Sequence, residues 1–448
     1  MKKITLLTSL LTFCILGWSQ TWNLVGTQGF STPVNANSLT SLALDNTGAP
    51  YVAYSDASNG NKITVMKFNG SSWVLVGPAG FTPGSGYDVS LAITSNNVPW
   101  VSYGDVANAS KASVMKFNGS NWVQVGSAAF STGVINNTTL KFGANDTAYI
   151  AYVDAAYSGK AVVKKYDGVS LWINVGIPGF TAGGTGQMTM ALNNADQPYV
   201  AYQDQANGFA ESVMKYNGST WLHVGAATFS NGTCQFSHIA FDQSKTIPYV
   251  CYNQGFSTFA PNVQVYSSFG WNYVGGQNLN TNMDYQNNIV LEGTNTPFVI
   301  FPDGALSSRA SVMMFNGSSW VYAGNTGFSS TGITYPNLSA DAMNNIYAEY
   351  YETNNLITVK RLNAITGINS NKRNFDLSIY PNPTTGKLSV DVKQKGELHI
   401  YTALGEEIKK QNLEEGVNAI DISNQPSGIY FVELRQDHSV WNGKIIKK

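Results

Sequence analysis

Short apolar runs separated by polar turn residues make up most of the first 363 residues, and none of these runs has a helical period. The first unit contains four such runs, at residues 38–45, 50–56, 63–68 and 73–77. Each run has about the usual length of a β-strand and is bounded by Gly, Asn, Asp or Pro. The third and fourth runs are joined by Asn69-Gly70, a favoured two-residue hairpin turn. The pattern predicts a four-stranded antiparallel meander.

The same unit is repeated along the chain, and a tryptophan marks each copy. The tryptophans are Trp22, Trp73, Trp122, Trp172, Trp221, Trp271 and Trp320, at steps of 51, 49, 50, 49, 50 and 49 residues. Six of the seven begin the pattern W-x-x-V-G. A period near fifty residues with four strands in each repeat is typical of a β-propeller blade.

Counting the repeats predicts seven blades. Six complete units begin near residues 38, 88, 137, 187, 236 and 286, and a seventh begins near Pro336 but has no fourth strand of its own. A lone strand at residues 21–26 can supply the missing one, which would leave no open sheet edge at the seam. We therefore expect an all-β chain in which residues 20–363 form a seven-bladed β-propeller closed by its N-terminal strand.

Residues 1–19 have the composition of a signal peptide. Lys2 and Lys3 precede an apolar run at residues 4–16, and small residues before Gln20 suit cleavage. The run is too short to span a bilayer, and no other segment has the length of a transmembrane helix. We expect a secreted protein or one on the outer-membrane surface, with no transmembrane segment.

Charge and cysteine content exclude several classes of function. The chain is 12% charged with a formal net charge of −1 and has no basic stripe, so we expect no nucleic-acid partner. Cys234 and Cys251 should remain free thiols, because strand geometry separates them by roughly 17 Å. The four histidines are scattered without the spacing of zinc ligands. We expect no metal and no cofactor.

The composition changes after Asn363. The last 77 residues contain 11 Lys and Arg and 10 Asp and Glu, although the whole chain has only 26 and 27. Residues 364–374 are typical of an exposed linker. Strand-like runs then recur through residues 375–448, and their spacing predicts a small C-terminal β-sandwich.

Four ordered motifs in this C-terminal part carry a family resemblance. They include Tyr380, Pro381, Asn382 and Pro383, then Gly405, then Gly428 and Tyr430, and finally Lys447 and Lys448. Together they resemble the type A C-terminal sorting domain of the Bacteroidota type IX secretion system. The resemblance implies that the type IX machinery is a partner, and that the domain is removed as the protein is released or anchored at the surface.

Two repeated features of the propeller are expected to be structural. The second strands end in an acidic ring of Asp56, Asp105, Asp154, Asp204, Asp303 and Glu352. An acid at a strand end accepts hydrogen bonds from the following turn, so we expect these groups to cap turns. The W-x-x-V-G pattern is weakly similar to tectonin-type lectin repeats, but tryptophan in every blade favours packing between blades.

Departures from the repeat are better candidates for a site. Glu349 falls where other blades have small or apolar residues, and we expect a cross-strand ion pair with Lys360; without that pair it would be a candidate acid. Blade five is irregular at residues 254–261. Its Gln254, Phe256 and Phe259 have no role in the repeat, so they are our candidates for ligand binding.

The sequence favours a non-catalytic, adhesion-type binding propeller with a glycan or protein ligand. No catalytic residue can be assigned, because nucleophile and phosphate-loop motifs are absent. A carbohydrate-active hydrolase or lyase with a site over the central channel stays an alternative, as does a structural component of a surface matrix. The loops after the second and fourth strands leave on one face, where binding residues are usually found.

Overall fold

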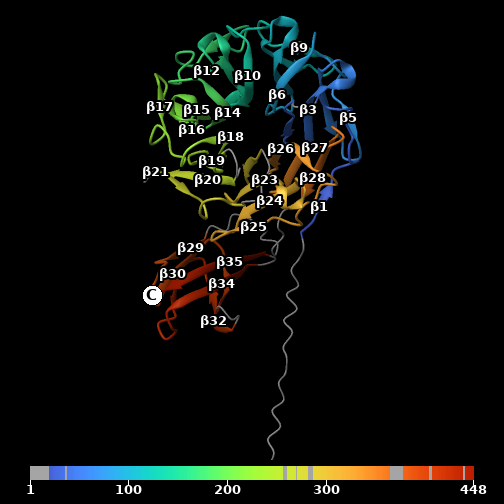
Figure 1. Ribbon diagram of the computed structural model, residues 1–448. Helices are drawn as coiled ribbons and strands as arrows, with labels where there is room; N and C mark the ends of the chain where they lie inside the picture. Colours follow the sequence, from blue (N-terminus) through green and yellow to red (C-terminus); the bar gives the residue numbers. More distant parts are fainter. Residues whose placement is uncertain are drawn as a thin grey trace, which may run out of the picture. The chain divides into compact units, whose positions relative to one another are not determined.

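The computed structural model describes residues 20–35, 38–255, 260–268, 270–280, 286–363, 377–402, 406–436 and 439–448. The chain forms two compact units, Met1–Ala364 and Ile365–Lys448. In the first unit, seven four-stranded antiparallel sheets are arranged around a central axis (Figure 1). The predicted seven-bladed β-propeller is confirmed.

The blades follow the chain in order, each with its innermost strand first. Blade one consists of β2 (Ser41–Leu44), β3 (Pro50–Asp56), β4 (Lys62–Phe68) and β5 (Trp73–Leu75). Blade two consists of β6 (Gly86–Ile93), β7 (Pro99–Asp105), β8 (Lys111–Phe117) and β9 (Trp122–Gln124), and blade three of β10 (Ile135–Phe142), β11 (Ala148–Asp154), β12 (Lys160–Tyr166) and β13 (Trp172–Asn174). Blade four consists of β14 (Thr185–Leu192), β15 (Pro198–Asp204), β16 (Ala210–Tyr216) and β17 (Trp221–His223). Blade five is β18 (Cys234–Phe241), β19 (Pro248–Gln254), β20 (Ala260–Ser267) and β21 (Gly270–Tyr273); blade six is β22 (Asn288–Leu291), β23 (Pro297–Asp303), β24 (Arg309–Phe315) and β25 (Trp320–Tyr322).

Blade seven joins the two ends of the propeller. It consists of β26 (Ile333–Ala340), β27 (Ile346–Glu352), β28 (Ile357–Leu362) and the N-terminal strand β1 (Trp22–Leu24). Strand β1 pairs antiparallel with β28, and Trp22 lies opposite Leu362. The predicted closing strand is therefore confirmed, and the outer edge of β28 is paired.

The repeated tryptophans connect neighbouring blades. Each indole Nε1 donates to a backbone carbonyl of the preceding blade, at 2.7 to 3.0 Å, as Trp73 does to Val25. Phenylalanines from the loops stack on these indoles, and the rings of Phe180 and Trp221 are 3.8 Å apart. The glycine of W-x-x-V-G has a positive φ, and a Cβ added to Gly77 would lie 3.0 Å from the Phe117 ring. The W-x-x-V-G pattern is thus a packing motif between blades.

Short 3-10 helices follow the second strands and contact the acidic ring. They are η1 (Ala57–Asn59), η2 (Val106–Asn108), η4 (Ala155–Tyr157), η5 (Gln205–Asn207) and η6 (Gly304–Leu306), while η3 (Ala144–Asp146) lies between β10 and β11. Asp56 is fully buried and accepts from Ser58 N at 3.0 Å, Asn59 Nδ2 at 2.7 Å and Thr64 Oγ1 at 2.9 Å. Glu352 likewise accepts from Ser330 N at 2.7 Å. Asp56 thus caps its own turn, whereas Glu352 binds the loop that precedes β26.

The expected ion pair between Glu349 and Lys360 is wrong. The register places Lys360 opposite Ala348 and places Val359 opposite Glu349, so the two side chains lie on opposite faces of the sheet. Glu349 is fully buried and accepts from Asn337 Nδ2 at 2.7 Å and Thr40 Oγ1 at 3.1 Å. Lys360 Nζ instead donates to the Phe328 carbonyl at 2.6 Å. Burial raises the pKa of Glu349 to about 7.

The cysteines agree with the expectation of free thiols. Cys234 and Cys251 are both buried and unbridged. Cys234 lies opposite Gln254, while Cys251 lies opposite His238, further along the same strand pair. Cys234 Sγ donates to the buried carboxylate of Glu211 at 2.9 Å, and burial raises the pKa of Glu211 to about 7.

The second unit has two sheets that share one apolar core. The first consists of β29 (Leu377–Tyr380), β30 (Lys387–Val392) and β33 (Gly416–Asp421), and the second of β32 (Glu407–Leu413), β31 (Gly396–Tyr401), β34 (Gly428–Gln436) and β35 (Ser439–Lys447). Buried residues from both sheets, including Val390, Ile420 and Val432, pack into one cluster. The predicted β-sandwich is confirmed.

The motifs at the two ends of this sandwich contact each other. Asn382 Oδ1 accepts from Ile446 N at 2.9 Å, and its Nδ2 donates to the Lys444 carbonyl at 2.8 Å. The backbone at Thr384 forms a parallel bridge with Lys447. Tyr430 Oη donates to the Pro426 carbonyl at 2.6 Å. Gly405 lies outside the described residues.

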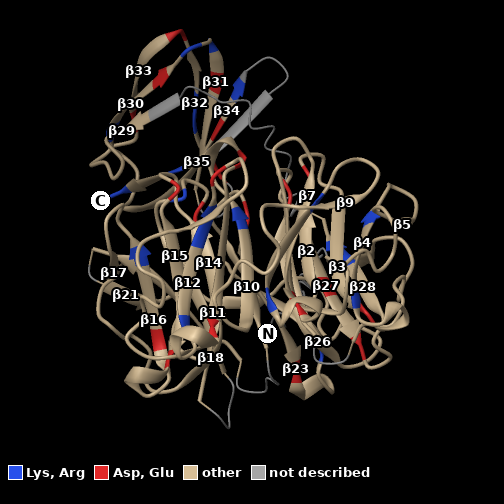
Figure 2. Cartoon of the chain, turned by 90° about the horizontal axis from the view of Figure 1, so that it is seen from above, with Lys and Arg blue, Asp and Glu red and all other residues tan. Residues whose placement is uncertain are grey.

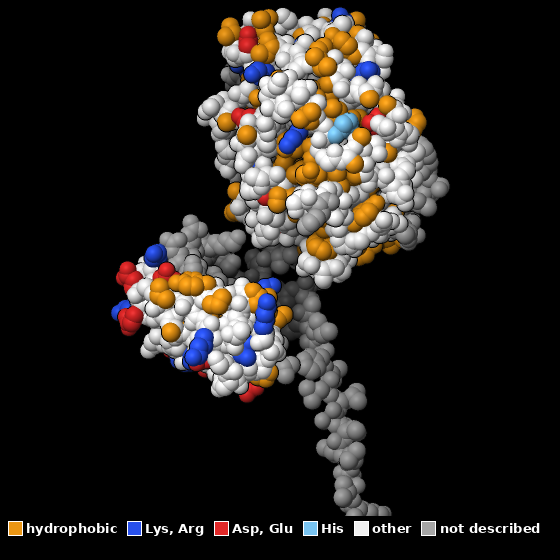
Figure 3. All heavy atoms as spheres, turned by 90° about the vertical axis from the view of Figure 1, so that its left-hand side faces the viewer, with side chains coloured by type: hydrophobic (Ala, Val, Ile, Leu, Met, Phe, Trp, Pro, Cys, Tyr) orange, Lys and Arg blue, Asp and Glu red, His pale blue; other side chains and the backbone are white. Residues whose placement is uncertain are grey.

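Charged residues are sparse along the blades, as the mostly tan ribbon in Figure 2 shows. The propeller surface visible in Figure 3 is likewise dominated by neutral polar and backbone atoms. Across the part of the chain that the structure describes, we find no helix with the length and apolar character needed to cross a bilayer.

Candidate functional site

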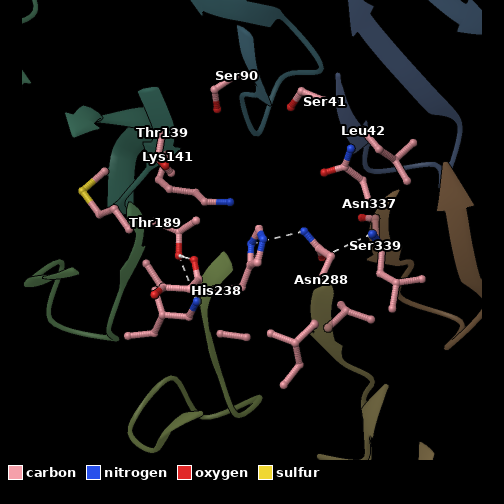
Figure 4. Close-up of a pocket in the computed structure, with 18 of the residues that line it drawn as sticks. Ser41, Leu42, Ser90, Thr139, Lys141, Thr189, His238, Asn288, Asn337 and Ser339 are labelled. Atoms are coloured by element: carbon pink, nitrogen blue, oxygen red, sulfur yellow. Dashed lines mark hydrogen bonds between the residues drawn. The ribbon is translucent and has the colours of Figure 1, made fainter. Parts of the chain in front are cut away.

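The innermost strands of the seven blades surround a central cavity of about 540 Å³. Its wall comes from β2, β6, β10, β14, β18, β22 and β26 and from residues beside them (Figure 4). Cavities that bind small molecules usually measure about 300–1,000 Å³. The axis of the propeller therefore has room for a small ligand.

A polar ring lines this cavity, with one side chain from the same register position of each blade. Its members are Ser41, Ser90, Thr139, Thr189, His238, Asn288 and Asn337. Several accept a backbone N–H from the next blade: Ser41 Oγ from Leu91 at 2.9 Å and Thr189 Oγ1 from Ile239 at 3.0 Å. The ring thus connects neighbouring blades, and most of its members have a structural role.

Lys141 breaks the seven-fold pattern at the position two residues beyond the ring, and its side chain lines the cavity. The equivalent positions of the other blades hold Ala43, Ala92, Ala191, Ala240, Val290 and Ser339. The Lys141 side chain is exposed to the cavity, and its amine projects into it in Figure 4. No described acid forms an ion pair with it. The protein around the amine restricts its hydration, which lowers the pKa of Lys141.

His238 is the second exception, because it occupies a ring position that Ser, Thr or Asn fills in the other blades. Asn288 Oδ1 accepts from Leu338 N at 3.3 Å, which orients its amide so that Nδ2 donates to His238 Nδ1 at 3.4 Å. Burial, followed by the charge of Lys141, lowers the pKa of His238 to about 4. The imidazole is therefore neutral at neutral pH, with Nε2 carrying the proton.

Acidic groups are scarce around this cavity. Asp242 is the only Asp or Glu among the described residues that line it, and its Oδ1 accepts from Thr246 N and Ile247 N at 2.8 Å. A second hollow of about 500 Å³ is lined by Asp88, whose Oδ2 accepts from Asn137 N at 2.8 Å. Burial raises the pKa of Asp88. The central cavity therefore lacks a pair of carboxylates among its described lining residues.

Of the three ligand-binding residues predicted from blade five, only Gln254 lies among the described residues. Phe256 and Phe259 lie outside the described residues. Gln254 ends β19, donates from Nε2 to the Asn231 carbonyl at 2.8 Å, and is not part of the cavity wall. No group of three or more His, Cys, Asp or Glu able to hold a metal occurs in the described ranges.

Sequence reasoning missed Lys141 and His238, although a signal for both is present in the sequence. Aligning the first strands of the seven repeats places a lysine among small residues and a histidine among Ser, Thr and Asn. In the second strands the corresponding exception is Glu349. The inward-facing positions of the first strands become distinguishable only once the register and the bulge in these strands are known.

Comparisons with known proteins identify the C-terminal unit and the fold of the propeller. Residues 378–448 match the family described as secretion system C-terminal sorting domain, so this part of the chain is a type IX sorting domain. The expected resemblance is confirmed, and it implies export. No match was found among curated proteins.

Solved structures similar to the propeller include both lectins and enzymes. The BP39L lectin from Burkholderia pseudomallei aligns with a TM-score of 0.56 at 14% identity, over 73% of this chain and 96% of the lectin. A polysaccharide lyase of family PL25, an ulvan lyase, gives 0.48 at 11% identity over 76% and 94%. Penicillium chrysogenum α-L-arabinanase gives 0.44 at 11% identity over 77% and 98%. At these identities the similarity concerns the fold alone.

Proposed function

We propose that this protein is a non-catalytic saccharide-binding propeller, exported by the type IX machinery to the cell surface or the medium, with its ligand in the central cavity. The observation that carries the proposal is Lys141, a cation exposed to the cavity at a position where the other blades have a small or apolar side chain. Residues 1–19 act as the signal peptide in this proposal.

The surroundings of Lys141 favour a role in binding. Its ammonium faces the cavity and forms no ion pair with a described acid, so no contact within the described fold accounts for the charge. The six other blades pack without such a charge, so the fold does not require it. An ionisable group with a shifted pKa in a cavity is a good candidate for a functional residue. A ligand anion would give the ammonium the ionic partner that it lacks among the described residues.

The cavity wall suits the hydroxyl groups of a sugar. Ser41 Oγ and Ser90 Oγ accept backbone N–H groups from the next blade, which leaves their own O–H hydrogens available as donors. His238 adds an Nε2 donor. The cavity volume of about 540 Å³ fits a small ligand or the end of a saccharide chain, and is too small for a folded protein partner.

Two features of the cavity argue against catalysis. Glycoside hydrolysis usually needs two carboxyl groups flanking the scissile bond, and Asp242 is the only acid in the described lining. A lyase needs a base to remove a proton next to a carboxylate, but a histidine with a pKa of about 4 is a weak base at neutral pH. The alternative of a lyase predicts an unsaturated product, which absorbs ultraviolet light and would accumulate with time.

The experiment compares a variant that fills the cavity with one that does not. Full-length protein carrying Ala191→Trp should lose binding on a glycan array, because Ala191 lines the cavity beside the lysine position. Ala195→Trp places the same side chain on the exposed turn between β14 and β15 and should bind as the wild type does. Equal binding by both variants, with unchanged melting temperatures, would contradict the proposal.

A third variant tests the other proposed location for the ligand. The double substitution Phe256→Ala and Phe259→Ala should leave array binding unchanged if the cavity holds the ligand. Loss of binding in this variant alone would transfer the site to the irregular segment of blade five. A propeller that binds no glycan on the array and only assembles with itself would favour the structural surface-matrix alternative.

A further inference from the structure

We propose that the cavity selects an acidic saccharide whose single anionic group pairs with Lys141 Nζ, while His238 and Asn288 bind neighbouring hydroxyls. This inference rests on the proposed function and names the class of its ligand. It follows from how the charged and polar groups are distributed along the cavity, not from Lys141 alone.

The positions of the two exceptional residues define one side of the cavity. Lys141 comes from β10 in blade three and His238 from β18 in blade five, and Figure 4 shows the lysine amine and the imidazole directed into the same space. Blade four lies between them and contributes Thr189 and Ala191, which are small. The space in front of these two residues can therefore hold a sugar unit in reach of both Lys141 and His238.

Among the titratable groups that face this space, Lys141 is the one that is charged and lies outside the turn of Asp242 and Lys245. The titratable groups in the described lining are Lys141, His238, Asp242, Lys245 and Tyr335. His238 is neutral, Asp242 is held by backbone N–H groups of its own turn, and Lys245 is exposed in that same turn. An anion beside Lys141 thus meets an unpaired ammonium and a neutral donor. A neutral ligand would leave the ammonium unpaired.

The acid in the second hollow favours a single negative charge on the ligand. Asp88 and Asn137 both line that hollow and lie near the starts of the inner strands β6 and β10. Asn137 also lines the central cavity, so the hollow adjoins the cavity there. A polyanion extending past Asp88 would bring like charges together, which is unfavourable. One acidic unit attached to neutral sugars avoids this repulsion and uses the hydroxyl and amide groups of the ring.

The test uses a charged disaccharide and a matched neutral form. The probe is a disaccharide of glucuronate and a neutral hexose, and the control ligand is its methyl ester, which keeps every hydroxyl but has no charge. Calorimetry on full-length wild-type protein at low salt should give at least tenfold tighter binding of the acid, about 1.4 kcal/mol. Added salt should reduce this preference.

Variants then assign the preference to one residue. Lys141→Met should bind the acid and the ester with equal affinity, whereas Lys141→Arg should keep most of the preference. Lys215→Met is the matched control, because Lys215 lies on β16 over the Tyr199 ring and outside the cavity lining. It should bind as the wild type does. Circular dichroism and melting temperature should show that all three variants remain folded.

The possible results separate this inference from the proposed function. Equal binding of acid and ester by the wild type would overturn the inference and leave the saccharide-binding function standing. If neither form binds and the glycan array is also blank, the proposed function itself fails. If sodium acetate or sulfate binds as tightly as the disaccharide acid, the cavity is a small-anion site and the assignment to a saccharide is overturned.

Discussion

The indole Nε1 of Trp22 donates to the backbone carbonyl of Ala323 at 2.8 Å, across 301 positions of sequence. The other six tryptophans make the same hydrogen bond to the preceding blade. The N-terminal strand β1 is therefore attached to blade six by the same contact that joins the other blades. Together with the pairing of β1 and β28, it closes the ring.

Removing residues 20–26 should therefore destabilise the propeller. The deletion exposes the edge of β28 and removes Trp22, whose side chain is buried against Phe328. We expect a lower melting temperature or aggregation in size-exclusion chromatography. Trp22→Phe and Trp172→Phe each remove one indole donor and should both cost about 1–3 kcal/mol. An unchanged melting temperature and monomeric elution after the deletion would contradict closure.

Much of this fold could be predicted from the sequence because each blade repeats the same local rules. The Trp period, the Asn-Gly turns and the unpaired strand at residues 21–26 were sufficient for seven blades and the seam. The cross-strand register is harder to predict from the sequence. A bulge or a one-residue shift moves a side chain to the other face of the sheet, which is why the sequence predicts Lys360 opposite Glu349 where the structure has Val359.

Glu349 should make stability depend on pH. Its pKa is about 7 in the folded protein and near 4.5 when exposed, so the folded state binds its proton more tightly. The contribution of Glu349 to stability should be greatest below pH 4.5, fall as the pH rises towards 7, and then level off, a change of about 3 kcal/mol. Glu349→Gln should melt higher than wild type at pH 8 and similarly at pH 4.5.

Glu211 gives an internal comparison for this prediction, because burial also raises its pKa to about 7. Glu211→Gln should reduce the pH dependence by a similar amount, and the double variant should remove most of it. A pH dependence that is identical in wild type and both single variants would show that these buried groups do not titrate as described.

The pKa of His238 should respond to the loss of Lys141. Burial is the larger cause of its low pKa, and the lysine charge is the smaller one. In Lys141→Met the pKa should rise above about 4 but stay below the ordinary value of 6.5. In the wild type, the contribution of His238 to stability is fully present above pH 6.5 and is lost as the pH falls through 4. The cause is that the imidazole binds its proton more tightly in the unfolded state than in the folded state. A pH titration of the imidazole by NMR measures the shift, and no change would place the two groups out of electrostatic reach.

The sorting domain should direct export without being needed for the propeller to fold. In a host with a type IX system, a chain ending at residue 374 should accumulate as folded propeller inside the outer membrane, while the full chain reaches the surface or medium. Asn382→Ala should reduce export, because Asn382 holds the C-terminal strand through Lys444 and Ile446. Normal delivery of the truncated chain would contradict this role.

The candidate site could be predicted less well than the fold. A site in a propeller is formed by a few residues that break the repeat. Whether such a residue can bind a ligand depends on which face of the strand carries its side chain. Lys141 and His238 face the axis, while Lys360 Nζ donates to the Phe328 carbonyl between the blades. Only the three-dimensional register separates such residues. The roles of Phe256 and Phe259 stay predictions.

The most direct test of ligand binding in the cavity is NMR of histidine side chains labelled with ¹³C at Cε1. The chain has four histidines, and His238 is the one that lines the cavity among the described residues. His223 lies on the outer strand β17 and serves as an internal control. Adding the glucuronate disaccharide should shift the His238 signal, leave His223 unchanged, and have no effect in Ala191→Trp. Binding detected by calorimetry with an unmoved His238 signal would contradict the cavity as the site.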